Sequence, residues 1–436
     1  MSPELIGVLG LLVMFVGLAL GFHIGIILAI TGFAGFVALA GFAKSLSLLT
    51  TTPYYTTTNY GFIALPMFIF MGELVFQGGI GTLLYSAASK WLGRLHGGLA
   101  MATVSSCAFF AALSGDSLSA SATFGKIALP EMTRYNYDSK FACGAIAGAA
   151  GLAVLIPPSG VMILYCIFTE VSLGKLLIAG VIPGIMSAII YMALIYFRVR
   201  LKPSLGPLST EVALWKEKLI ALGYIAPVAV VMVVMLGGIY LGVFSPIEAA
   251  AIGAFTVLVE VVVLKKLSLT TLRTAMVNVA KTTAMIFWVI IGAMIFSKFL
   301  VLSGLPDALS VFISGLPVPN LVILIIILLI YIALGCFMSV VAMLAITLPI
   351  FFPLLTGLGF DGVWLGILIV LEVEMAAITP PIGMNVYVLK ATVGDLVSTG
   401  GIFRGVVPFF LADILILAIL VAFPQISLWL PSTMFQ

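Results

Sequence analysis

Charged side chains are scarce in this chain of 436 residues, of which 8% are charged and 63% are hydrophobic. A soluble domain typically carries about 25% charged residues, so this composition excludes a water-soluble globular protein. The net charge of +3 is too small to indicate nucleic-acid binding. The composition therefore predicts an integral membrane protein, with no polar stretch long enough for a separate soluble domain.

Histidine and cysteine are also rare, with two histidines and four cysteines in the whole chain. Two histidines cannot form a histidine-rich metal site, and the cysteines lack metal-like spacing and are expected to be packing residues. There is no HExxH motif, and Leu113 interrupts the Gly-x-Gly-Asp pattern of aspartyl intramembrane proteases. The sequence therefore does not predict an enzyme.

Apolar runs long enough to cross a bilayer recur along the whole chain. A spanning helix needs roughly 20 apolar residues. The first such run is expected to be a span rather than a signal peptide, because it lacks a basic n-region and a small-x-small cleavage site. About ten spanning helices are predicted, near 5–21, 25–42, 61–87, 141–168, 177–198, 219–237, 246–264, 275–300, 363–389 and 405–423.

Several short patterns occur once in each half of the chain and in the same order. The adjacent prolines 157–158 in IPPSG are matched by 380–381 in TPPIG. Matching loops differ in charge, because 90–96 is positive whereas 310–320 carries no charge. Positive loops tend to face the cytoplasm, so equivalent loops are expected on opposite sides of the membrane. This is an inverted-topology repeat, an arrangement common in secondary transporters.

Charge and length also set the expected domain boundaries. The first repeat is predicted at 1–200 and the second at 219–436, joined by a hydrophilic cytoplasmic connector at 201–218. The sequence thus predicts an all-α polytopic membrane protein built from two inverted repeats.

Each repeat is expected to contain one re-entrant hairpin and one broken helix. The charges of the neighbouring loops require the segments 97–130 and 321–350 to leave the membrane on the side from which they enter. These two segments are therefore predicted to be the hairpins. The broken helices are predicted at 141–168 and 363–389, because two adjacent prolines halfway along a helix interrupt its hydrogen bonding. Irregular backbone is tolerated at membrane depth where it is buried in protein or lines a cavity. A plain structural kink is the alternative for either break.

The predicted hairpin tips and breaks carry the chemistry. The first tip holds Ser114, Gly115, Asp116 and Ser117, whose hydroxyl and carbonyl oxygens suit sodium. The second tip is less polar, and its candidates are Gly335 and Ser339. Unwound carbonyls, together with Ser159, Thr379 and Asn385, can face these tips, while helix N-termini favour anions. A cation site and an anion site are therefore predicted side by side in each repeat, with tight helix packing by small residues as the alternative.

Other acids lie in apolar segments. Glu73 and Glu372 are candidate proton or interface residues, although a structural hydrogen-bonding role is expected for each intramembrane glutamate taken alone. The remaining glutamates of this kind are Glu248, Glu260 and Glu374.

Taken together, these motifs resemble a known family. LPMFIFMGELV, SGDSLSASATFGKIALPEM, IPPSGVMILY, FSPIEAAAIGAF and ITPPIGMNVYV look like the large membrane (M) subunit of tripartite ATP-independent periplasmic (TRAP) transporters, and the resemblance covers essentially the whole chain. It implies the ion-transporter superfamily fold and an elevator-type mechanism in the bacterial inner (cytoplasmic) membrane. It also implies a small four-helix membrane (Q) subunit, a soluble periplasmic substrate-binding (P) protein, a small organic acid substrate and sodium as coupling ion, without any cofactor.

The resemblance further implies two sodium sites and one substrate site. The first sodium site would comprise Ser114, Gly115, Ser117, Ile156 and Pro158. The second would comprise Gly335, Thr379, Pro381 and Gly383. Substrate would lie near Asp116, Ser117, Ser159 and Asn385.

The first tip departs from the family pattern, which often reads GSS where this chain reads Gly115-Asp116-Ser117. The acid can pair with a cation, be protonated or point away from the site. Two other transport classes stay open, namely a self-contained sodium–carboxylate carrier of the same superfamily and a channel with paired hairpins.

Overall fold

The computed structural model describes residues 1–208 and 213–434, and every regular element within them is helical. Residues 209–212 of the predicted connector and 435–436 of the predicted second repeat lie outside the described residues. Seven helices of the described part are long and apolar enough to cross a membrane, or eight if α8 and α9 count as one bent span. The predicted all-α, multi-pass fold is confirmed.

The first half of the chain contains the helices α1 to α11. They are α1 (Pro3–Ala19), α2 (Ile24–Ala40), α3 (Phe42–Thr58), α4 (Ala64–Gln77), α5 (Ile80–Leu92), α6 (Gly98–Ser114), α7 (Ser117–Arg134), α8 (Ser139–Leu155), α9 (Gly160–Thr169), α10 (Leu173–Ala179) and α11 (Val181–Leu201). Those of the second half are α12 (Trp215–Tyr240), α13 (Pro246–Val263), α14 (Leu269–Ser303), α15 (Leu305–Ser314), α16 (Asn320–Gly335), α17 (Val340–Gly357), α18 (Gly362–Ile378), α19 (Met384–Val393), α20 (Thr399–Ala422) and α21 (Gln425–Ser432).

Both helical hairpins and both broken helices are present. The pairs α6–α7 and α16–α17 form the hairpins, and α8–α9 and α18–α19 are the interrupted helices. The hairpins extend beyond the predicted ends, to Arg134 and Gly357, because Pro130 and Pro349 lie inside helices rather than ending them. Proline is tolerated within membrane helices when surrounding groups satisfy the freed backbone.

Several predicted boundaries differ from the structure. The predicted span 61–87 is two helices, α4 and α5, separated by Gly79 in the left-handed region with φ +67°. The predicted connector 201–218 is partly helical, since α12 begins at Trp215. The predicted helix 275–300 is the central part of α14, which is 35 residues long.

The helix α3 was not predicted, because its threonine-rich sequence lacks a spanning run. Its hydroxyls bond to its own backbone, as when Thr51 donates to the Ser47 carbonyl (2.6 Å) and Thr57 to the Pro53 carbonyl (2.8 Å). Such bonds satisfy hydroxyls without water, so this polar sequence can form an exposed helix.

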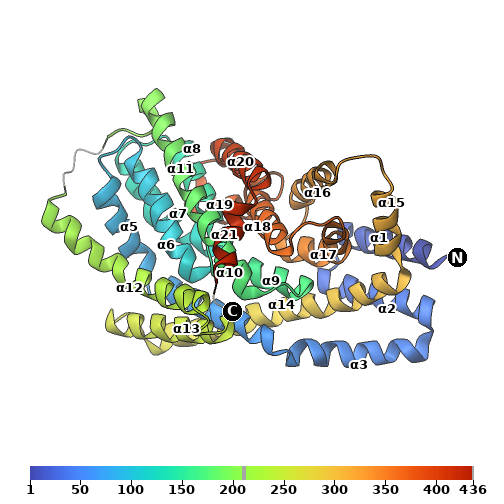
Figure 1. The fold of residues 1–436 in the computed structure, drawn as a ribbon. Helices are drawn as coiled ribbons and strands as arrows, with labels where there is room; N and C mark the ends of the chain where they lie inside the picture. Colours follow the sequence, from blue (N-terminus) through green and yellow to red (C-terminus); the bar gives the residue numbers. More distant parts are fainter. Residues whose placement is uncertain (209–212, 435–436) are drawn as a thin grey trace.

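The two halves exchange partners across the molecule (Figure 1). Helix α7 of the first hairpin packs against α19 of the second broken helix, and α17 of the second hairpin packs against α9 of the first. Within each half, α6 packs on α8 and α16 on α18. The same elements thus make equivalent contacts in both halves, while the exact repeat boundaries and their opposed membrane orientation stay predictions.

Helices α8 and α20 approach closely at two glycines. A Cβ added at Gly144 would lie 2.8 Å from the Cα of Gly405, closer than real Cβ contacts allow. Small residues permit such close backbone approach in membranes.

Replacing Gly144 with alanine should therefore destabilise the protein, by about 1–3 kcal/mol as for an overpacked core. The matched control is Gly237→Ala in α12, where an added Cβ meets no atom within 4 Å. Thermal unfolding in detergent should show a lower Tm for G144A only. An unchanged Tm for G144A would show that α8 and α20 are not in such close contact.

Candidate functional site

The first break lies between α8 and α9 and is fully enclosed. Ile156, Pro157 and Pro158 follow the end of α8, and all three are buried. Ser159 is the N-cap of α9 and accepts a hydrogen bond from the Val161 N–H at 3.2 Å. The backbone between the two half-helices is thus irregular but shielded from the surface.

The tip of the first hairpin contacts this break directly. The Gly160 N–H donates a hydrogen bond to the Gly115 carbonyl at 3.4 Å. Gly115 has φ +59°, and a Cβ there would lie 2.5 Å from the Pro158 carbonyl oxygen. On the other side, a Cβ on Gly72 of α4 would lie 2.6 Å from the Ser114 carbonyl oxygen. The tip is therefore held between α4 and the break, and neither Gly72 nor Gly115 has room for a side chain.

Of the predicted first sodium site, this contact brings Gly115 and Pro158 together. Ser114 is buried, and its hydroxyl has no hydrogen-bond partner among the described residues. Ser117 and Ile156 are also buried. Carbonyl and hydroxyl oxygens at one enclosed place form a donor set that suits sodium, but their coordination of an ion stays a prediction.

Asp116 is the N-cap of α7. Its carboxylate accepts hydrogen bonds from the backbone N–H groups of Leu118 (3.2 Å) and Ser119 (2.9 Å) and from the Ser119 hydroxyl (2.5 Å). Of the three arrangements left open by the sequence, the structure thus shows a carboxylate turned onto its own helix. Acidic N-caps are favourable because they satisfy free N–H groups and face the positive end of the helix dipole.

The second hairpin and its break are also in contact. An added Cβ on Gly335 would lie 3.3 Å from the Cα of Ala376 in α18. Thr379 ends α18, and its hydroxyl donates to the Met375 carbonyl at 2.6 Å. Gly383 precedes α19 with φ +38°. Gly335 thus packs against α18 one turn before Thr379, while coordination of an ion by these residues stays a prediction. Ser339 is the N-cap of α17, but its side chain makes no capping hydrogen bond.

The two breaks differ in exposure. Pro157 and Pro158 are buried, whereas Pro380 and Pro381 are exposed. At the adjoining tip, Phe337 is 71% exposed. In both breaks the bond between the adjacent prolines is cis. The second break is therefore exposed and the first is buried, although Asp116 at the tip of the first hairpin is exposed as well.

Asn385 lies in the first turn of α19 and is fully buried. Neither its amide oxygen nor its amide nitrogen has a partner within the described part of the chain. A buried amide without partners costs roughly 1–3 kcal/mol. An unsatisfied amide beside a helix break is the signature expected of a ligand-binding group.

The sequence matches a family described as "Tripartite ATP-independent periplasmic transporter, DctM component" over residues 11–426. It is 34% identical over 405 residues to the C4-dicarboxylate TRAP transporter large permease protein DctM of Pseudomonas aeruginosa, covering 92% of this chain and 93% of that protein. It is 30% identical to the ectoine TRAP transporter large permease protein TeaC of Halomonas elongata, covering 96% and 97%.

The chain belongs to the TRAP transporter large permease family. It is accordingly a multi-pass protein of the inner membrane, and the relatives are transporter permeases rather than enzymes. The solved structure of the Alcanivorax borkumensis YdaH transporter shares the fold, with a TM-score of 0.58 at 18% identity over 88% of this chain and 89% of that one.

Some functional candidates of the permease were missed from its sequence. Asp413 is fully buried in α20 and contacts the hydroxyl of Tyr191 in α11. The signal was available, since an acid within the apolar run 405–423 is costly in a membrane and usually functional. By contrast, Glu73 accepts hydrogen bonds from Asn278 (3.2 Å) and Gln77 (3.5 Å), and Glu248 forms a capping box with Ser245. Both carboxyls therefore already have hydrogen-bond donors, as expected for a structural role.

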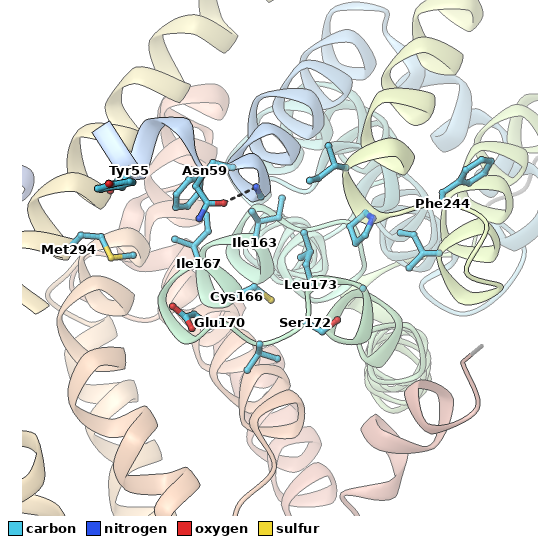
Figure 2. A pocket seen from close by; sticks show the side chains of 18 of the residues that line it. Tyr55, Asn59, Ile163, Cys166, Ile167, Glu170, Ser172, Leu173, Phe244 and Met294 are labelled. Atoms are coloured by element: carbon cyan, nitrogen blue, oxygen red, sulfur yellow. Dashed lines mark hydrogen bonds between the residues drawn. The ribbon is translucent and has the colours of Figure 1, made fainter. Parts of the chain in front are cut away.

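A separate cavity of about 680 Å³ lies beside α9, away from the hairpin tips. Figure 2 shows its lining, with Tyr55 and Asn59 from the α3 region, Ile163 and Ile167 from α9, and Met294 from α14. No predicted site residue lines this cavity. It separates the far end of α9 from α3 and α14.

The contact of Gly115 with Pro158 gives a test of the first site. Gly115→Ala should displace the tip from the break, because both the positive φ and the 2.5 Å approach oppose a side chain. Gly304→Ala is the matched control, since Gly304 has φ +69° but nothing within 4 Å of an added Cβ. Substrate uptake should fall at least about tenfold in G115A, which corresponds to about 1.4 kcal/mol, and remain near wild type in G304A. Equal losses in both variants would assign the effect to backbone strain alone.

Proposed function

We propose that this permease imports a small organic acid anion into the cell, driven by sodium flowing down its gradient. The observation that supports this most directly is the doubled arrangement of a hairpin tip against a broken helix. Non-helical backbone at membrane depth is typical of sites that bind ions and substrate in secondary transporters.

For sodium, the proposal uses the oxygen atoms at each break. The first site would be formed by carbonyls and hydroxyls of Ser114, Gly115, Ser117, Ile156 and Pro158, and the second by Gly335, Thr379, Pro381 and Gly383. The unpartnered hydroxyl of buried Ser114 supports the first assignment, because a buried hydroxyl normally has a partner. Sodium would supply that partner.

For the substrate, the proposal places the anion near Asp116, Ser117, Ser159 and Asn385. Since the Asp116 carboxylate already occupies the N-terminus of α7, the anionic group is expected nearer to Ser159 and Asn385, where α9 and α19 begin. The relatives are named for C4-dicarboxylates, sialic acid, isethionate and ectoine. The chemistry that we propose for this chain is a small molecule with a carboxylate or a comparable acidic group.

Two partners complete the proposed transporter. A TRAP system is tripartite by name, and we expect a small four-helix membrane (Q) subunit and a soluble periplasmic substrate-binding (P) protein. One relative, the isethionate TRAP transporter permease protein DctMQ of Oleidesulfovibrio alaskensis, is 31% identical over 378 residues, which cover only 58% of its length. The extra length of this relative, and the letter Q in its name, support a second membrane component in the proposed transporter.

An elevator motion is proposed for the transport step. The two hairpins and two broken helices exchange partners and would move as one body. The cavity of about 680 Å³ between α9 and the helices α3 and α14 leaves one side of that body loosely packed. Loose packing at a boundary supports sliding, because close-packed interfaces resist it.

Uptake into proteoliposomes tests this function. The permease should be reconstituted with its Q subunit, and a panel of small organic acids offered with and without their P proteins. Uptake that requires both an inward sodium gradient and a P protein would support the tripartite importer. Sodium-driven uptake without any P protein would instead indicate a self-contained sodium–carboxylate carrier, and uptake without any ion gradient would indicate a channel.

Ser114→Ala should raise the sodium concentration needed for half-maximal uptake about tenfold, since loss of one oxygen ligand is worth about 1.4 kcal/mol. Thr57→Val is the control, because it also removes one hydroxyl. The Thr57 hydroxyl bonds only to backbone carbonyls of the exposed helix α3, so its loss should leave the sodium dependence unchanged. An unchanged sodium dependence in S114A would remove Ser114 from the site.

Asn385→Leu should weaken uptake of the organic acid at saturating sodium while leaving the sodium dependence near wild type. The buried, unpartnered amide of Asn385 is expected to bond the substrate. Uptake should be measured across substrate concentrations, and a changed KM with an unchanged sodium midpoint is the expected result. A shift in the sodium midpoint alone would place Asn385 at a cation site instead.

A further inference from the structure

Three ionisable side chains meet in the interior, away from both hairpin tips. Tyr191 of α11, Glu374 of α18 and Asp413 of α20 are each fully buried. The Tyr191 hydroxyl lies 3.2 Å from Glu374 Oε1 and is also in hydrogen-bonding contact with Asp413 Oδ1. One phenol oxygen thus joins two carboxyl groups.

If both acids were ionised, the three side chains would hold one hydrogen for two hydrogen-bonding contacts. A phenol carries one hydrogen and can donate to only one of the two carboxyls. An ionised carboxylate is only an acceptor, so the second contact requires a hydrogen on one of the acids. With one carboxyl protonated, that carboxyl donates to the tyrosine oxygen and the tyrosine donates to the other carboxyl. The geometry therefore requires one proton in addition to that of the phenol.

The surroundings also oppose two negative charges. A Cβ on Gly151 of α8 would lie 3.0 Å from Glu374 Oε1, so α8 presents bare backbone to this carboxyl. Glu372, which lies on α18 like Glu374, is also fully buried, and its carboxyl has no hydrogen-bond partner among the described residues. Two like charges that share one site in a low-dielectric interior cannot both remain ionised.

No cation of the packed helices neutralises the pair. The basic side chains on helices α8, α10, α11, α19 and α20 are Lys140, Lys175, Arg198, Arg200, Lys390 and Arg404. In residues 1–208 and 213–434, none of them forms a hydrogen bond or an ion pair with Glu374 or Asp413. Tyr331 on α16, which also packs on α18, is bonded to Thr347 instead. With no basic side chain bonded to either acid, a shared proton lowers the charge of the pair from two negative charges to one.

We propose that Glu374 and Asp413 form a proton-binding site, bridged by Tyr191, that is distinct from the predicted sodium and substrate sites. Glu374 lies on the same half-helix as Thr379, which ends α18 at the second break. Loss of the shared proton would raise the charge between α11, α18 and α20 from one negative charge to two, and the repulsion between the two carboxylates would separate the helices that position this break. Proton occupancy thereby controls whether the second break keeps its shape.

Infrared difference spectroscopy of the full-length protein in lipid nanodiscs tests the site without any transport assay. The wild type should show the carbonyl stretch of a protonated carboxylic acid at neutral pH, and this band should disappear at alkaline pH. In a Glu372→Gln background, which removes the other buried and unpartnered carboxyl of α18, Glu374→Gln and Asp413→Asn should each remove the band, because an amide can donate to the tyrosine and the remaining acid is then free to ionise. Loss in only one variant would still support the site and would assign the proton to that residue.

The matched control is Glu73→Gln, which removes a glutamate that already has two donors. It should leave the protonated-acid band unchanged. Absence of the band from the wild type, or its persistence in both E374Q and D413N, would overturn the proposal.

A second measurement concerns transport, and only this arm depends on the proposed function. Wild-type uptake should fall about tenfold for each pH unit beyond the alkaline midpoint, as for loss of one required proton. E374Q and D413N should remove this fall, because their amides supply the hydrogen permanently. Tyr191→Phe should instead shift the midpoint, since it removes the bridge. Folded but inactive amide variants, together with a flat wild-type pH profile, would show that the acids act as ionised ligands and would overturn the proposal.

Discussion

The interior of a membrane offers no water to backbone groups, and this constraint decides where the helices of the permease can stop. Each of the four interruptions in the hairpins and broken helices exposes amide and carbonyl groups that need partners. At the first site the solution is visible, because Gly160 bonds to Gly115 and the Asp116 carboxylate caps α7. The hairpin tip and the break therefore satisfy one another, and the groups that remain unsatisfied are those available to ligands.

The two halves meet this constraint unequally. The first break is buried and its tip is fixed by α4, whereas the second break is exposed and its tip carries the exposed Phe337. The two proline breaks thus differ in exposure within a single conformation, although both tips reach the surface, the first through Asp116.

The sequence was sufficient for the features that follow from local rules. Adjacent prolines located both breaks, and apolar length with loop charge located both hairpins. It was not sufficient where tertiary contacts decide, as with Tyr191 and Asp413, which lie far apart in the chain and meet only through helix packing. The direction of the Asp116 side chain was likewise undetermined, because its capping bonds depend on where α7 begins. The helix α3 was missed for another reason, since its hydroxyls are satisfied by backbone that only exists once the helix has formed.

The exchange of partners between the halves has a consequence for biosynthesis. Helix α7 rests on α19, and α9 rests on α17, so both leave the ribosome long before their partners are made. During that interval, lipid or an insertase must cover the faces of α7 and α9 that later contact their partners, so that the half-inserted chain does not aggregate. The first half therefore reaches its full native packing only after α17 and α19 of the second half have been made.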